Sequence, residues 1–262
     1  MRIARYTVDD RIQFGVVELE ADGGANPETV SALTADPLSG PVKLTGERHD
    51  LAGVRLLAPV IPRSKVVGLA RTGGAGGTTG RVAEPAIFLK PNTSVIGPGE
   101  AIQLPPGRSD VAITAELAIV VGRIARSVPL ERVPEVIFGY TVANDVTARG
   151  FVGPDAPWGL AKSWDSFTPL GPWIATHLSL EEVGSLALST AVDGDWVSGA
   201  NLADMAQSVA AAVSFISGVM TLLPGDVILP GATAGWTPIR AGQQVSIDID
   251  EIGSLTNPVV DA

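Results

Sequence analysis

The stretch GYTVANDVTARG, residues 139–150, carries an apolar run directly into a polar turn. GYTVAN is typical of a buried β-strand, and DVTARG is typical of the turn that ends it. The turn holds Asp145 and, four residues later, Arg149. A carboxylate and a guanidinium at one strand end indicate a functional site, although an Asp that caps a turn and an Arg in a surface ion pair would give the same pattern.

Short apolar segments of this kind recur along the 262-residue chain, which contains 30 Gly and 20 Pro. Residues 2–20 alternate apolar and polar side chains, which predicts a β-hairpin. Helices are expected at residues 27–35, 129–138 and 201–222, the last with methionines in its core-facing stripe. The strand segments include residues 65–70, 85–91 and 113–122. The sequence therefore predicts a mixed, predominantly β architecture, a barrel or rolled sheets.

A change in composition near residue 62 predicts two domains. Residues 1–62 are expected to form a small N-terminal domain, and residues 63–262 a larger one that carries the site. His49, in the first domain, is interpreted as a solvated loop residue. His177, in the second, is interpreted as structural.

Composition also limits location and partners. No apolar run reaches the about 18 residues that a membrane span needs, and the N-terminal residues lack the apolar core of a signal peptide. The formal net charge is −10, and the four lysines form no basic run. Because nucleic-acid binding depends on clustered Lys and Arg, we expect a cytoplasmic protein with a small-molecule partner and no contact with nucleic acid or membrane.

Glu116 lies in an otherwise apolar run, and Thr114 precedes it by two residues, so both side chains should share one face of a strand. A buried carboxylate needs a partner, because an unpaired charge in the interior costs several kcal/mol. With no cysteine in the chain, Glu116 and Asp145 could together hold Mg²⁺ through oxygen ligands. An ion pair with Arg149 or Lys162 is the competing interpretation.

Six segments resemble, in order, the fumarylacetoacetate hydrolase superfamily: KVVGLA, PAIFLKPNTSVIGPGEAI, AELAIVVG, GYTVANDVTARG, LAKSWDSFTPLGP and LLPGDVILPGATAG. The similarity covers about residues 55–257, and the small preceding domain also fits. The resemblance implies a β-roll, a homodimer and an Mg²⁺-dependent enzyme. Such enzymes bind a 2-oxo or 1,3-diketo acid and stabilise an enolate while a C–C bond is cleaved, decarboxylated or isomerised.

The resemblance also implies a metal site that is degenerate in this chain. The family holds its metal with a Glu-x-Glu pair and the Asp of a DVTAR block. Glu116 and Asp145 match this set, but the first Glu is replaced by Thr114. Loss of one charged ligand removes several kcal/mol of attraction for a cation at an effective dielectric of about 20, so the presence of Mg²⁺ is doubtful.

Lys162 and Arg149 match family positions that contact substrate oxygens, and they are the expected catalytic residues. The expected substrate-binding residues are Lys90, Arg71, Val152 and Thr233. Val152 stands where the family has a glutamine, so an apolar contact replaces a polar one. Together with Trp158 and Trp164, it indicates a more apolar substrate than is usual in the family.

The family commonly supplies a water-activating His and a lid Glu, but here these positions fall on Gly74 and Gly77 in a segment with five glycines in nine residues. No His, Asp or Glu occurs between Leu69 and Arg81 to act as a base. We therefore expect a non-hydrolytic enzyme of a keto or enol compound, which catalyses isomerisation, cyclisation, dehydration or decarboxylation in a biosynthetic pathway. The alternatives are an Mg²⁺-dependent C–C hydrolase and a pseudoenzyme without turnover.

Overall fold

The strand half of the stretch at residues 139–150 forms β12 (Ile137–Asn144), which is paired on both sides within the largest sheet. It lies between β11 (Ala115–Val121) and β14 (Thr168–Ala175). The computed structural model describes residues 1–19, 28–70, 85–152, 158–205, 208–231 and 234–262. Within these residues, no helix is both long and apolar enough to cross a membrane.

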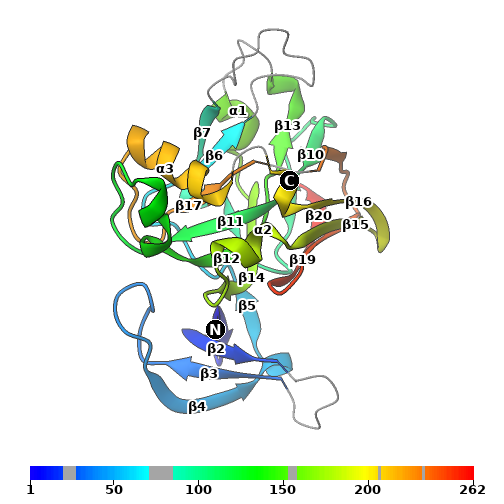
Figure 1. Ribbon diagram of the computed structural model, residues 1–262. Helices are drawn as coiled ribbons and strands as arrows, with labels where there is room; N and C mark the ends of the chain where they lie inside the picture. The colour runs from blue at the N-terminus through cyan, green and yellow to red at the C-terminus, as the bar shows by residue number, and fades with distance from the viewer. Residues whose placement is uncertain (20–27, 71–84, 153–157, 206–207, 232–233) are drawn as a thin grey trace.

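The largest sheet has 12 strands and includes the N-terminal hairpins (Figure 1). Its continuous path is β4 (Leu44–Asp50), β3 (Thr29–Leu33), β2 (Arg11–Glu18), β1 (Arg2–Val8), β14, β12, β11, β17 (Val227–Leu229), β6 (Val66–Ala70) and β7 (Ala86–Lys90). Two further strands, β5 (Arg55–Leu57) and β8 (Val95–Ile96), pair with β1 and β14.

Two smaller sheets and a few short helices complete the described fold. One sheet has the order β13 (Thr147–Ala148), β10 (Val111–Ile113), β18 (Thr237–Pro238), and the other the order β16 (Asp195–Asn201), β15 (Ala187–Val192), β19 (Gln244–Ile249), β20 (Gly253–Asp261), β9 (Ile102–Leu104). The α-helices are α1 (Trp158–Lys162), α2 (Leu180–Gly184) and α3 (Val209–Val219). The 3₁₀ turns are η1 (Leu51–Gly53), η2 (Asn92–Ser94), η3 (Leu130–Glu135), η4 (Arg149–Phe151) and η5 (Leu202–Asp204).

The core explains why β11 is apolar throughout. All seven of its residues are buried, and successive side chains enter different clusters because they point to opposite faces of the sheet. Leu117 and Ile119 belong to the largest cluster, whereas Ala118 and Val120 belong to a second one. A strand covered on both faces places Glu116 in the interior.

The prediction of a predominantly β chain with a small N-terminal domain is confirmed, and so is the hairpin at residues 2–20, formed by β1 and β2. The helix predicted at residues 27–35 is wrong, because β3 occupies Thr29–Leu33 between β2 and β4. Pairing on both edges, with β-branched side chains, outweighs the local helix pattern. The boundary between residues 1–62 and 63–262 stays a prediction, since β1 of the N-terminal part pairs directly with β14.

The other two predicted helices are shorter than expected. Within residues 201–222, α3 covers only Val209–Val219, because the Ser208 hydroxyl accepts a hydrogen bond from the Ala211 N–H and starts the helix there. Met205 and Met220 pack against the core, as predicted. Residues 129–138 form η3 and the start of β12. Pro134, which has no N–H to donate, lies inside η3, and the N-cap is Pro129 and not Ser127.

Gly68 and Phe88 give a test of the strand pair that carries Lys90. Gly68 on β6 faces Phe88 on β7, and a Cβ on Gly68 would lie 2.0–2.5 Å from three ring atoms. We expect Gly68→Ala to lower the free energy of unfolding by about 1–3 kcal/mol, because the ring must shift. Urea unfolding measures this, with Gly53→Ala as control, since a Cβ there meets nothing within 4 Å. Equal stability of the two variants would contradict the packing described.

Candidate functional site

The site lies where β11 and β12 meet the turn at Asp145. Ala115 pairs with Asn144 in the ladder of these two strands. Just beyond it, the Thr114 N–H donates to the Asp145 carbonyl oxygen (3.3 Å) and the Asp145 N–H donates to the Thr114 carbonyl oxygen (2.9 Å). The backbone on both sides of the Asp145 carboxylate is thereby fixed.

Two lysines hold the Asp145 carboxylate. Lys90 Nζ, at the end of β7, lies 2.6 Å from Asp145 Oδ1, and Lys162 Nζ, at the end of α1, donates to Asp145 Oδ2. The side chains of Lys90, Asp145 and Lys162 are only 0%, 2% and 3% exposed. Lys90 also donates to the Val146 carbonyl oxygen at 3.1 Å. We call these three side chains the lysine–aspartate cluster.

Charge in the cluster explains the direction of each pKa shift. Burial by itself would raise the pKa of Asp145, but the ammonium groups of Lys162 and Lys90 bring it below its usual value. Burial lowers the pKa of Lys90 to about 8, although Asp145 opposes this shift. Asp145 is therefore an ionised carboxylate held by cationic partners.

Glu116 is the second buried carboxyl of the site. Its Oε2 accepts a hydrogen bond from the Gly231 N–H at 3.0 Å. Gly231 has a φ of 108°, a conformation that a residue with a side chain rarely adopts. Burial is the main cause that raises the pKa of Glu116 to about 8, and repulsion from the Asp145 carboxylate is the second. Glu116 is therefore largely uncharged at neutral pH.

Aromatic rings surround the cationic groups. Lys162 Nζ lies 4.6 Å from the centroid of the Phe88 ring and 5.3 Å from that of Trp236. The Arg149 guanidinium carbon lies 4.7 Å from the Trp236 centroid. The Phe88 and Trp158 rings are stacked, with centroids 5.8 Å apart. Trp236 therefore contacts both of the residues that sequence analysis identified as catalytic.

Sequence analysis missed Phe88 and Trp236. A signal for Phe88 was present, because it precedes Lys90 by two residues on a strand and must share its face. Trp158 similarly precedes Lys162 by four residues in α1, so both lie on one side of the helix. Trp236 offers no local signal. Trp164, which was grouped with Trp158, instead lies beside Phe167 and packs against the core.

The structure brings together some predicted residues and not others. Lys90, Glu116, Asp145 and Lys162 meet. Of the two ion-pair partners expected for the carboxylates, Lys162 pairs with Asp145, and Lys90 is a second partner that was not expected. Thr114 is buried, and its hydroxyl donates to the Asp145 carbonyl oxygen at 3.1 Å. Val152 is half-buried and its N–H bonds to the Arg149 carbonyl oxygen. The other predicted substrate contacts, Arg71 and Thr233, lie outside the described residues, as do Gly74 and Gly77.

Neither histidine is near these contacts. His49 does not lie in a loop as predicted: it belongs to β4, and its ring packs edge-on against Tyr6 with centroids 5.9 Å apart. His177 follows the end of β14 and is exposed, with Nδ1 3.4 Å from the Met1 carbonyl oxygen. Its structural interpretation stays a prediction.

The arrangement of oxygens does not fit a divalent cation as it stands. Both carboxylate oxygens of Asp145 accept from ammonium groups, and one oxygen of Glu116 accepts from Gly231. Mg²⁺ needs six oxygen ligands in an octahedron, and no group of three or more His, Asp or Glu occurs among the described residues. A cation would have to displace a lysine from Asp145.

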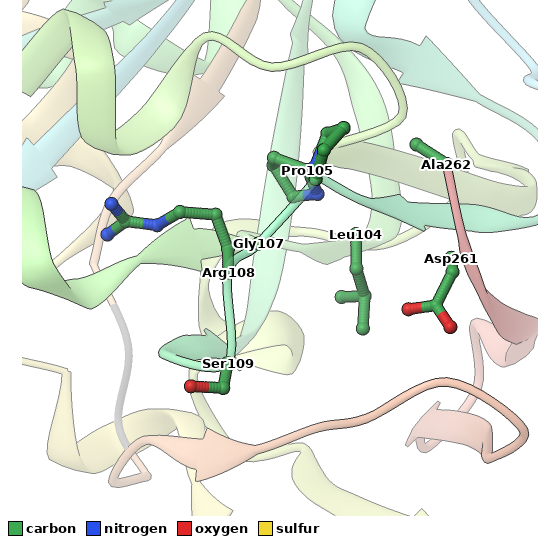
Figure 2. Close-up of a pocket in the computed structure, with 8 residues that line it drawn as sticks. Leu104, Pro105, Gly107, Arg108, Ser109, Asp261 and Ala262 are labelled. Atoms are coloured by element: carbon green, nitrogen blue, oxygen red, sulfur yellow. The ribbon is translucent and has the colours of Figure 1, made fainter.

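A cavity of about 370 Å³ lies in another part of the fold (Figure 2). Figure 2 shows Arg108 and Asp261 on opposite sides of it, with Leu104 between them. None of the lysine–aspartate cluster lines it. Arg108, which lines the cavity, pairs with Asp110, whose carbonyl oxygen accepts from the Arg149 N–H at 2.9 Å.

Comparisons with known proteins cover almost the whole chain. Residues 70–260 match the family described as fumarylacetoacetate (FAA) hydrolase C-terminal, and residues 1–59 match the Rv2993c-like N-terminal family. Protein Rv2993c of Mycobacterium tuberculosis is 43% identical over 99% of this chain and 98% of its own length. Oxaloacetate tautomerase Fahd2a of Rattus norvegicus is 32% identical over 97% of this chain and 86% of its own.

Two solved structures each match over the full length of this chain and over their own full length. The 5-carboxymethyl-2-hydroxymuconate delta-isomerase of Mycobacterium smegmatis has 40% identity and a TM-score of 0.88. The maleylpyruvate hydrolase of Sphingobium sp. SYK-6, solved with manganese(II) and pyruvate, has 29% identity and a TM-score of 0.77. One related enzyme thus binds a divalent cation.

The raised pKa of Glu116 predicts how stability depends on pH. The folded state holds this proton up to about pH 8, whereas the unfolded chain releases it near pH 4.5. Protonated Glu116 therefore makes its full contribution to the free energy of unfolding below about pH 4.5. This contribution is then lost as pH rises through the folded pKa, by at most ~1.4 kcal/mol per pH unit for one proton. We expect Glu116→Gln to flatten the decline in urea midpoint between these two values.

The measurement is made in EDTA, so that no divalent cation competes with the proton. Glu131→Gln on the exposed surface is the matched control. Parallel pH profiles for wild type and Glu116→Gln would contradict an uncharged Glu116.

Proposed function

The chain belongs to the fumarylacetoacetate hydrolase family, and from this premise we propose that it is an isomerase that shifts a proton within a small keto or enol acid without hydrolysing a C–C bond. The observation that carries the proposal is the lysine–aspartate cluster with Arg149 beside it. Enzymes of this family include the isomerase, the tautomerase and the hydrolase similar to this chain.

Charge development explains the role of the cations. When a proton leaves the carbon next to a carbonyl group, the C–H electrons form an enolate and negative charge moves to the oxygen. Lys162 and Arg149 contact one ring, that of Trp236, so one small acid can meet both. Preorganised cations at a developing oxyanion lower the barrier, and we assign Lys162 and Arg149 to this role.

Glu116 is the candidate for carrying the proton. It is buried beside Asp145, and the bond from Gly231 occupies only one of its oxygens. A general acid or base must reach the proton that it transfers, and the described residues form no hydrogen bond to the other oxygen of Glu116. The ionised form of Glu116 takes the proton from carbon, and the neutral form so produced returns it to the neighbouring carbon or to the enolate oxygen; with a pKa of about 8, both forms are present near neutral pH.

Exchange of carbon-bound protons tests the assigned roles. We expect the protein to accelerate exchange of the C3 protons of oxaloacetate or pyruvate in D₂O, followed by NMR. Lys162→Met and Arg149→Met should each lower the rate about 100-fold, because an oxyanion donor is lost. Lys43→Met and Arg132→Met, on the exposed surface, should leave it unchanged. No acceleration by wild type, or full activity of Lys162→Met, would refute the proposal.

An alternative is a metal-dependent C–C hydrolase, favoured by the similarity to the maleylpyruvate hydrolase solved with manganese(II). In that case a cation would replace a lysine at Asp145. The remaining alternative, a pseudoenzyme, would show neither reaction.

Chelation separates the first proposal from the hydrolase. We expect exchange activity to persist after dialysis against EDTA and to change less than about twofold when Mg²⁺ or Mn²⁺ is restored, because the lysines already hold Asp145. Pyruvate release from an acylpyruvate, followed by a coupled assay, should stay at background. Chelator-sensitive release of pyruvate would establish the hydrolase instead.

A further inference from the structure

Three aromatic rings from different parts of the chain meet at the candidate site. Phe88 belongs to β7, Trp158 begins α1, and Trp236 directly precedes β18. Phe88 and Trp158 are stacked with an interplanar angle of 16°, and Lys162 contacts both Phe88 and Trp236. We call Phe88, Trp158 and Trp236 the aromatic wall.

The wall has one buried member and two open ones. Phe88 is 4% exposed and lies over Gly68, where a side chain would collide with it. Trp158 and Trp236 are only half-buried. A buried ring that is packed on both sides supports its neighbours, whereas a partly exposed indole beside cationic groups can contact a ligand.

Charge limits what the same site accepts. The groups include three cations, Lys90, Lys162 and Arg149, and one ionised carboxylate, Asp145, because Glu116 is largely uncharged at neutral pH, so the set carries two net positive charges. This charge suits the enolate of a 2-oxo acid with one carboxylate, whose carboxylate and enolate oxygen carry two negative charges. Val152, half-buried beside Arg149, offers an apolar contact.

We propose that the substrate is an enolisable 2-oxo acid with one carboxylate and a flat aromatic or conjugated substituent, which lies against Trp158 and Trp236 while the carboxylate and carbonyl oxygens face Arg149 and Lys162. This inference rests on the proposed function, since it names the substrate class of that site. The proposed substrate differs from the compounds for which two relatives are named, oxaloacetate and 5-carboxymethyl-2-hydroxymuconate, because each of these compounds bears more than one carboxylate.

The test compares two ligands that undergo no reaction. Cinnamate and fumarate share a flat trans-alkenyl carboxylate, and cinnamate has a phenyl ring where fumarate has its second carboxylate. We expect titration calorimetry to show cinnamate binding at least about tenfold more tightly, because its ring stacks on the indoles. Tighter or equal binding of fumarate, or no binding of cinnamate, would overturn the inference.

Variants locate the effect. Trp236→Leu should weaken cinnamate about tenfold and change fumarate less than about twofold, whereas Trp236→Phe should retain most of the preference. Trp196→Leu is the matched control, since Trp196 is 71% exposed on β16. Thermal unfolding checks that each variant is folded, and Trp158→Leu replaces Trp236→Leu if the latter is not. An unchanged ratio in every folded wall variant would refute the role of the aromatic wall.

The two proposals fail separately. Because neither ligand is turned over, a preference for cinnamate without proton exchange would refute the isomerase and leave the substrate class standing. Exchange of oxaloacetate protons with no preference for cinnamate would refute the substrate class and leave the isomerase standing. A direct comparison of phenylpyruvate with oxaloacetate in the exchange assay then tests both proposals, and phenylpyruvate should have the higher kcat/KM by about tenfold or more.

Discussion

The buried pairing of Asp145 with Lys90 and Lys162 is the interaction on which the rest of the site depends. Each charge would cost several kcal/mol if left alone in the interior, so the carboxylate must sit where both ammonium groups reach it. Lys90 comes from β7 and Lys162 from α1, so the ion pairs join these elements to the end of β12. The position of one carboxylate thereby sets the place of three elements and of the aromatic rings they carry.

The strand pair around Asp145 supplies the rigidity that such a cluster needs. Because β11 is buried on both faces and is paired with β12 and β17, the ladder cannot slip without exposing its apolar side chains. Glu116 is carried on this strand, and Gly231 reaches it from the segment after β17. Glu116, whose carboxyl is costly to ionise, is therefore held by a strand that is buried on both faces and paired on both edges. Such a conflict with local stability is expected at a functional site.

Much of this could be predicted from sequence. The strands, Glu116, Asp145 and the two lysines follow from short apolar runs and from segment similarity. The partner of Asp145 could not be chosen between Arg149 and Lys162, because ion pairing depends on side-chain positions that spacing does not fix. Residues 27–35 were misassigned because β3 is defined by pairing on both edges and not by its own propensity. Trp236 is distant in sequence from the residues it meets, so only the folded chain reveals it.

The two lysines also suggest why this site would favour one class of chemistry over another. Ammonium groups on Asp145 provide positive charge at the place where a divalent cation would otherwise bind, and like a cation they can stabilise an enolate oxygen. They do not lower the pKa of a bound water as a metal can. The sequence also has no His, Asp or Glu between Leu69 and Arg81 to act as a base there. Polarisation without water activation is sufficient for moving a proton and insufficient for hydrolysis.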